Sequence, residues 1–149
     1  MELRKKNRPL SSEYIRGLVE GEGVFTFSSN NLTGSKIPAF VIKMHARDKN
    51  LLEMVRDTLG LKNKVYEYNH QGRDGIKRGP RAMLIVREIG NIKNIVVPLF
   101  YGKLRGNKGK QFEEWLKKIG GDPAVPESYK LVYKLCISGY YDKNPKFTD

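Results

Sequence analysis

Ten residues near the start of the chain, Tyr14-Ile-Arg-Gly-Leu-Val-Glu-Gly-Glu-Gly23, decide how the rest is interpreted. As a helix, this stretch has four residues along one side: Tyr14, Gly17, Leu18 and Gly21. A glycine inside a helix costs about 1 kcal/mol relative to alanine, so two of them predict a surface that another backbone approaches closely. The helix then presents Glu22 at its C-terminal end, where the macrodipole is already negative. A carboxylate there needs a nearby divalent cation or lysine, which indicates a chemical role.

Length and charge favour one domain that binds a polyanion. The 149 residues, taken as a single domain over 1–149, carry 28 Lys and Arg against 16 Asp and Glu, for a net charge of +12 and a pI near 9.8. A hydrophobic fraction of 39% with 10% aromatic residues is too high for a disordered basic tail. We therefore expect nucleic acid as the partner, in preference to a charge that serves only solubility.

The same composition argues against other classes of protein. A single cysteine, Cys136, excludes an intramolecular disulfide or a cysteine zinc site, and its apolar neighbours predict a buried thiol. The longest apolar run, 95–101, is interrupted by Pro98 and is too short to span a bilayer. The basic N-terminus lacks an apolar segment typical of a secretion signal. We expect an intracellular protein (cytoplasm, nucleoid or organelle) that engages neither a membrane nor a small-molecule substrate.

The periodicity of the chain predicts an α+β fold in which a ββα unit occurs twice after the first helix. The expected elements are a helix from Ser12 to about Gly21, strands Val24–Ser29 and Pro38–His45, helix Asn50–Leu59, strands Lys64–His70 and Ala82–Arg87, and helices Ile92–Phe100, Lys108–Ile119 and Ser128–Ile137. Pro98 is expected as a kink or late break. The two ββα halves give one four-stranded antiparallel sheet with helices on a single face and extra helices at the C-terminal end.

That arrangement leaves the second face of the sheet bare. Its residues are expected to be polar, basic or aromatic, with few aliphatic ones, which is tolerable for a face in water but better read as a DNA-binding surface on a basic protein. The expected contacts on the strands are Thr26, Ser28, Asn30, Lys43, His45, Lys64, Tyr66, Tyr68, His70 and Arg81. A basic, glycine-rich loop from Gln71 to Pro80 adds Arg73, Lys77 and Arg78.

The opening motif followed by ββαββα resembles the LAGLIDADG homing endonucleases. The resemblance covers about residues 12–115 and includes Pro98 and the block Asn107-Lys-Gly-Lys110. Only one copy of the motif is present, and the family implies that such members are homodimers with the motif helices packed at the interface. Close approach across that two-fold axis would then explain the glycines, with the interface formed by Tyr14, Gly17, Leu18 and Gly21.

The resemblance also assigns site residues where positions match. Glu22 stands where the family has its essential metal ligand, usually an aspartate, and the Gly21 carbonyl is a candidate further ligand. Glu20 is expected at the helix end or interface. Lys108 aligns with the lysine near the scissile phosphates, with Lys110 as the close alternative, and Arg105 belongs to the preceding basic run as a further DNA contact.

One position departs from the family pattern. A glutamine is common at the end of the second strand, and here the pattern falls on Ala46, which cannot order a water molecule. His45 or Arg47 is a candidate substitute, although the metal ions alone could suffice. His45 is equally well interpreted as a plain DNA contact.

The resulting hypothesis is an intron-encoded double-strand DNA endonuclease that uses Mg²⁺. It would hydrolyse both strands of a long, near-palindromic site across the minor groove and leave short 3′ overhangs. Mn²⁺ or Ca²⁺ could occupy the same site, with Ca²⁺ expected to be non-catalytic. The alternatives are a catalytically inactive RNA maturase, a DNA-binding regulator on the same scaffold, or a generic basic ribosome-associated protein. The acid at 22 and the lysine at 108 favour the enzyme.

Overall fold

The fold is one curved antiparallel sheet with helices packed against a single side. The computed structural model describes residues 8–71 and 74–149. Its elements are α1 (Ser12–Glu22), β1 (Gly23–Ser29), β2 (Lys36–His45), the 3-10 turn η1 (Ala46–Asp48), α2 (Lys49–Thr58), β3 (Tyr66–Gln71), β4 (Lys77–Val86), α3 (Ile89–Asn91), the π turn η2 (Ile92–Val96), α4 (Val97–Phe100), α5 (Asn107–Gly121), α6 (Glu127–Ile137) and α7 (Tyr140–Lys143).

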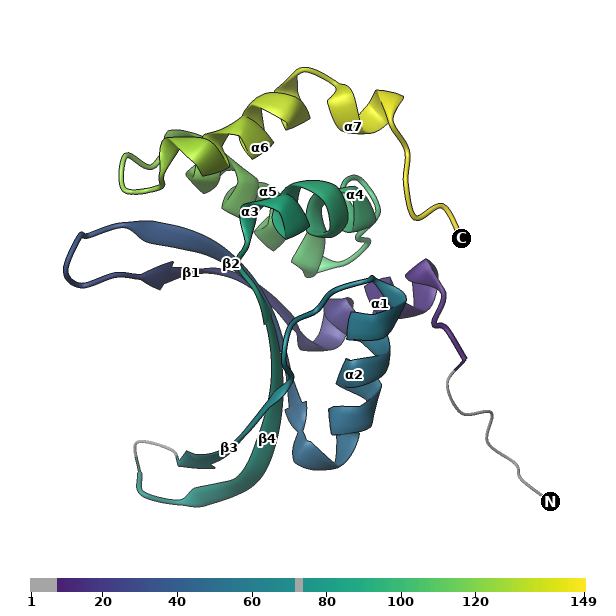
Figure 1. Ribbon diagram of the computed structural model, residues 1–149, viewed down its shortest axis with the longest axis vertical. Helices are drawn as coiled ribbons and strands as arrows, with labels where there is room; N and C mark the ends of the chain where they lie inside the picture. Colours follow the sequence, from purple (N-terminus) through teal and green to yellow (C-terminus); the bar gives the residue numbers. More distant parts are fainter. Residues whose placement is uncertain (1–7, 72–73) are drawn as a thin grey trace.

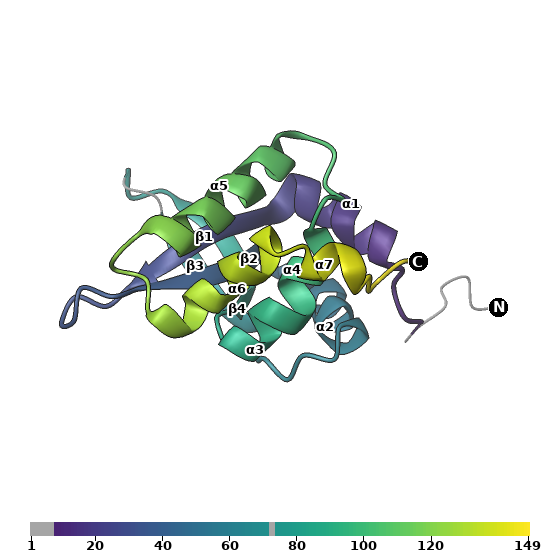
Figure 2. The same cartoon turned by 90° about the horizontal axis from the view of Figure 1, so that it is seen from above.

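The sheet has the strand order β1-β2-β4-β3, and all three neighbouring pairs are antiparallel. The helices cover its convex side, whereas the concave side is left uncovered (Figure 1). Viewed from above, α5 and α6 lie over the end of the sheet that carries β1 (Figure 2). The expected α+β class with a four-stranded antiparallel sheet is confirmed. No helix of the described chain is both long and apolar enough to span a membrane.

An aromatic cluster joins α5 to the sheet. The Phe25 ring of β1 lies 5.4 Å from that of Phe40 on β2, 4.9 Å from Phe112 and 5.3 Å from Trp115. The Trp115 indole N–H also donates to the Thr26 carbonyl at 2.7 Å. Large rings in contact bury much apolar area and add specific geometry. The position of α5, which carries Lys108, is therefore tied to β1.

The helix α1 begins and ends as the local sequence predicts. Ser11 is the N-cap, and its hydroxyl accepts a hydrogen bond from the Tyr14 N–H at 3.0 Å. At the other end, Gly23 passes directly into β1, and a Cβ there would lie 2.5 Å from Val19 Cγ1. Only glycine fits this junction, so the last glycine of the motif has a packing role.

The second half of the chain departs from the predicted boundaries. β4 begins at Lys77, so the expected loop to Pro80 is shorter, because pairing with β3 extends the hairpin despite its glycines. Lys64 lies before β3, which starts at Tyr66. The helix around Pro98 begins at Ile89 and continues through a π turn, which places the proline in the first turn of α4, where its missing N–H is tolerated.

Candidate nucleic-acid interface and cleavage site

The end of α1 brings together the two residues expected to act in cleavage. Glu22 is the last residue of the helix, and its side chain is exposed, with no hydrogen-bond or ion-pair partner in the described part of the chain. The Lys108 ammonium, at the start of α5, donates to the Gly23 carbonyl at 2.6 Å. A lysine thus stands at the negative end of the helix dipole, where the motif creates the need for a positive charge.

The side of α1 that carries the glycines is free. A Cβ placed on Gly17 or Gly21 would have no heavy atom of this chain within 4 Å beyond the helix itself. Tyr14 is exposed and Leu18 half-buried, whereas Ile15 and Val19 on the opposite side are fully buried. The helix therefore has one face in the core and one face, the glycine face, open for contact with another molecule. The glycine face consists of Tyr14, Gly17, Leu18 and Gly21.

The register of the strands places most of the expected DNA contacts on the concave face. His45 pairs with Arg81, which pairs with Tyr68, and Lys43 pairs with Met83, which pairs with Tyr66. Residues opposite each other across a ladder point to the same side of a sheet. By the same alternation, the face includes Thr26 and Ser28 on β1. His70 belongs to β3 but lies where the register shifts between Asn69 and Gln71, so the alternation assigns it no face.

The concave face is more aliphatic than expected. Thr26 pairs with Ala39, Val24 with Val41 and Ser28 with Ile37, so these apolar residues share the face. Ala39 and Val41 are nevertheless buried, because β2 is a central strand with β1 and β4 on either side. The prediction of few aliphatic residues on this face was wrong, because the two-residue period of β2 places Ile37, Ala39 and Val41 on the same side as Lys43 and His45.

Arg87 is a concave-face residue that the sequence reasoning missed. Its guanidinium donates to the Ser28 hydroxyl at 3.4 Å across the position of Ala39, and both side chains line an open groove at the outer end of β1. Arg81, Met83 and Ile85 lie on the concave side of β4, and Arg87, the next odd position just past the end of the strand, continues this alternation, which is the signal in the sequence.

His45 is held by a local hydrogen bond. Its Nδ1 accepts from the Arg47 N–H at 3.0 Å, which caps η1. With Nδ1 as the acceptor, Nε2 is the ring nitrogen that can donate to another molecule. Ala46 lies in η1 and contributes no polar side chain, and Arg47 is exposed. His45 is therefore oriented by its bond to the Arg47 N–H and lies on the concave face. That it orders a water molecule or contacts a base stays a prediction.

Several expected contacts lie elsewhere. Asn30 follows β1, where its side chain accepts from the Leu32 N–H at 2.9 Å in the hairpin loop. The exposed Arg105 lies beside α1, 3.9 Å from Glu13, and not on the sheet. Lys110 is exposed on α5. Lys64 precedes β3, but its ammonium lies 5.4 Å from the centre of the Tyr66 ring and so stays next to the concave face. Arg73 lies outside the described residues, and for Lys77 and Arg78 the structure describes only the backbone, within β4.

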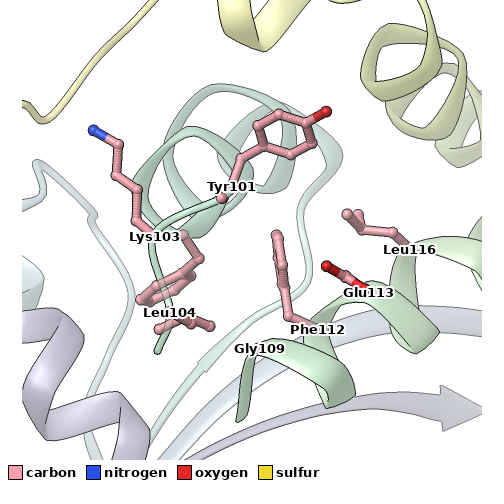
Figure 3. A pocket seen from close by; sticks show the side chains of 9 residues that line it. Tyr101, Lys103, Leu104, Gly109, Phe112, Glu113 and Leu116 are labelled. Atoms are coloured by element: carbon pink, nitrogen blue, oxygen red, sulfur yellow. The ribbon is translucent and has the colours of Figure 1, made fainter. Parts of the chain in front are cut away.

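A pocket of about 350 Å³ lies on the helical side of the molecule (Figure 3). Tyr101, Leu104, Phe112 and Leu116 supply most of its apolar wall, and it takes no side chain from the concave face. Cys136 is also on this side; burial raises the pKa of its thiol to about 11, as expected for a structural cysteine. Neither feature belongs to the candidate site.

The comparisons with known proteins agree with the observed fold and identify a family. The family model described as LAGLIDADG endonuclease matches residues 15–119. A probable intron-encoded DNA endonuclease 1 from Mycosarcoma maydis is 31% identical over 68 residues, which span 46% of this chain and 25% of that protein. The chain thus spans about a quarter of this curated relative.

Two solved structures extend the likeness to three dimensions. The homing endonuclease I-TnaI superposes with a TM-score of 0.59 at 24% identity, over 88% of both chains, which shows the fold. The I-LtrWI LAGLIDADG homing endonuclease bound to target DNA superposes with a TM-score of 0.56 at 27% identity, over 72% of this chain and 36% of that one. With the motif at the free end of α1 and a family match over most of its length, this chain belongs to the LAGLIDADG endonuclease family.

Proposed function

We propose that the protein is a homodimeric, divalent-metal-dependent homing endonuclease that cuts both strands of a long, near-palindromic DNA site across the minor groove and leaves short 3′ overhangs. The observation that carries this proposal is that the exposed Glu22 ends the motif helix and the Lys108 ammonium binds the carbonyl of the next residue, Gly23. A protein that only binds DNA gains nothing from an unneutralised carboxylate next to phosphates.

The donor atoms at this end suit a hard cation. Mg²⁺ prefers oxygen ligands and usually combines one or two carboxylates with substrate phosphates. Glu22 and the Gly21 carbonyl would supply the protein oxygens of one chain. The described residues contain no group of three or more acidic, histidine or cysteine side chains, so one chain alone offers an incomplete set. A second chain and the DNA phosphates would complete it. The bound cation would activate water and stabilise the leaving oxygen.

Lys108 is suited to stabilise charge on the scissile phosphate. Its ammonium has three N–H donors, of which the Gly23 carbonyl occupies one. The bond holds the nitrogen at the mouth of the site and leaves two donors for phosphate oxygens. Positioned donors of this kind act where negative charge develops in the transition state.

The concave face would hold the duplex on either side of the cleavage site. Lys43, His45, Arg81 and Arg87 supply donors there, and the net charge of +12 favours association with a polyanion. One sheet reads half of a long site, so a two-fold arrangement of two chains matches a near-palindromic target. The open glycine face of α1 supports packing against a second copy of the motif helix.

The same scaffold could instead serve as a catalytically inactive RNA maturase or DNA-binding regulator. Ala46, in place of a water-ordering glutamine, is the observation that favours this alternative. The two functions differ in one respect that can be measured directly, because a binder retains DNA without producing metal-dependent breaks.

A plasmid pool carrying inverted repeats of a random half-site separates the two. We expect wild-type protein with Mg²⁺ to linearise a reproducible subset of plasmids, and chelation with EDTA to stop the reaction. Glu22→Gln should lower the cleavage rate by about 10³-fold or more while DNA retention on filters stays unchanged. Glu114→Gln, at an exposed glutamate on α5, makes the same change in net charge and should cut normally. Retention without any linear product from wild-type protein would establish the binder instead.

A further inference from the structure

The two glutamates of the motif have opposite surroundings. Whereas Glu22 has no partner in the described chain, Glu20 accepts hydrogen bonds through both carboxylate oxygens. Its Oε2 accepts from the Arg105 N–H at 2.8 Å, and its Oε1 accepts from the Gly106 N–H at 3.1 Å. These donors are 85 and 86 residues away along the chain. Glu20 therefore links α1 to the segment that leads into α5.

This link supplies a hydrogen-bond acceptor and a negative charge at the start of α5, where the N-cap residue has no side chain. Gly106 is the N-cap of α5 and has no side chain with which to accept a hydrogen bond. The first N–H groups of a helix need acceptors, and a negative charge near them is favourable. The Glu20 carboxylate, from another helix, accepts from the N–H of the N-cap and from the N–H before it, and its negative charge lies next to the first turn of α5. It stabilises the start of α5 and at the same time fixes where that start lies.

Lys108 follows Gly106 by two residues and returns to the same end of α1. Its bond to the Gly23 carbonyl at 2.6 Å closes a ring that runs from Glu20 through Gly106 and Lys108 to Gly23. We propose that Glu20 is a positioning residue for cleavage, which fixes the Lys108 ammonium at the end of α1 that carries Glu22. The inference rests on the proposed nuclease function, and it explains why the motif carries two acids although only the second is exposed.

If Glu20 served only as a helix cap, a replacement cap would restore both the stability and the cleavage rate. A serine at an N-cap can supply its own acceptor to the first turn. Gly106 has the extended backbone of an N-cap, and a Cβ there would lie 3.4 Å from Glu20 Oε1, so serine fits. Gly106→Ser restores capping of α5 without restoring the link to α1. Stability and rate can therefore be separated in one background.

The experiment compares four proteins on a plasmid that the wild type cuts: wild type, Glu20→Gln, Glu20→Gln with Gly106→Ser, and the charge-matched Glu114→Gln. We expect Glu20→Gln to reduce the single-turnover rate by about 10- to 100-fold, with half-saturating protein concentration unchanged, because Glu20 acts through Lys108 and not on DNA. The Gly106→Ser partner should recover the thermal midpoint and not the rate. Recovery of both by the double variant would overturn the proposal, as would a normal rate for Glu20→Gln.

Hydrogen exchange in the wild type keeps the test decisive if Glu20→Gln fails to fold or if the wild type cuts nothing. The Arg105 and Gly106 amides lie in exposed residues and should exchange slowly only if the Glu20 bonds persist in solution. Free exchange at both amides would overturn the inference whatever the protein does to DNA. If the wild type cuts no DNA and both amides are protected, the nuclease proposal is contradicted, whereas the link between Glu20 and the Arg105 and Gly106 amides is confirmed.

Discussion

The two faces of α1 differ in how completely the fold uses them. The core face buries Ile15 and Val19, and it also buries Arg16, whose guanidinium donates to the Leu99 carbonyl at 2.7 Å, to Glu13 and to the Phe147 carbonyl. On the glycine face Leu18 packs partly against the core, whereas Tyr14 is exposed and the space above Gly17 and Gly21 is open. The core face of α1 is thus fully used by contacts within the single chain.

The contrast shows which motif residues the monomer itself requires. A helix that needed only to fold would place alanine or leucine where Gly17 and Gly21 stand, since both glycines lower helix stability and neither meets a steric limit. Gly23 is the opposite case, because its own chain surrounds it. The unexplained cost on the glycine face is the physical argument for a second copy of the helix.

A large side chain on the glycine face should break the dimer and, with it, cleavage. In Gly17→Leu, each inserted side chain would cost about 1–3 kcal/mol at a close helix contact, and a two-fold interface takes two of them. We expect analytical ultracentrifugation to show monomers at concentrations where the wild type is dimeric, with loss of double-strand cuts. The unfolding free energy of the monomer should not fall. A dimeric, active Gly17→Leu would contradict the proposed interface.

Two alanine substitutions, one within α1 and one at its C-cap, should have opposite effects on stability. Gly23→Ala places a Cβ 2.5 Å from Val19 Cγ1 and 2.9 Å from the Val19 carbonyl oxygen, so we expect a loss of about 1–3 kcal/mol. Gly17→Ala has free space and should gain up to about 1 kcal/mol from helix propensity. Urea denaturation at a protein concentration that keeps both variants monomeric measures the difference. Equal destabilisation by both would show that a side chain at position 17 is as confined by its own chain as one at position 23.

Much of this comparison could be predicted from the sequence because helices and strands have fixed periods. The 3.6-residue period separates Gly17 from Val19, and the two-residue period places His45 and Arg81 on one face. The start of β4 at Lys77 could not be predicted the same way. Its residues have weak intrinsic strand preference, and the pairing that imposes the strand comes from β3, so the decision is tertiary.

The site shows the same division between local and long-range information. The position of Glu22 at a helix end follows from the motif, but its isolation does not, because that depends on which groups fold nearby. Lys108 could be placed beside it only through resemblance to the family. The partners of Glu20 lie 85 and 86 residues away, and no period in the sequence relates them.

The smallest expected effect concerns the tie between the start of α1 and the end of the chain. The Ser12 hydroxyl and N–H both donate to the Asp149 carboxylate, and these bonds lower its pKa from an ordinary value of 3.8. A carboxyl whose pKa is lowered in the folded state contributes stability above its unfolded pKa, and that contribution disappears as the pH falls through the folded value. Asp149→Asn should therefore lower the thermal midpoint slightly at pH 7 and by a vanishing amount at acidic pH. Thermal melts of both proteins between pH 2.5 and 7 test this. A difference in thermal midpoint that persists at pH 2.5 would mean that the Ser12–Asp149 contact stabilises the fold without needing the charge of the carboxylate.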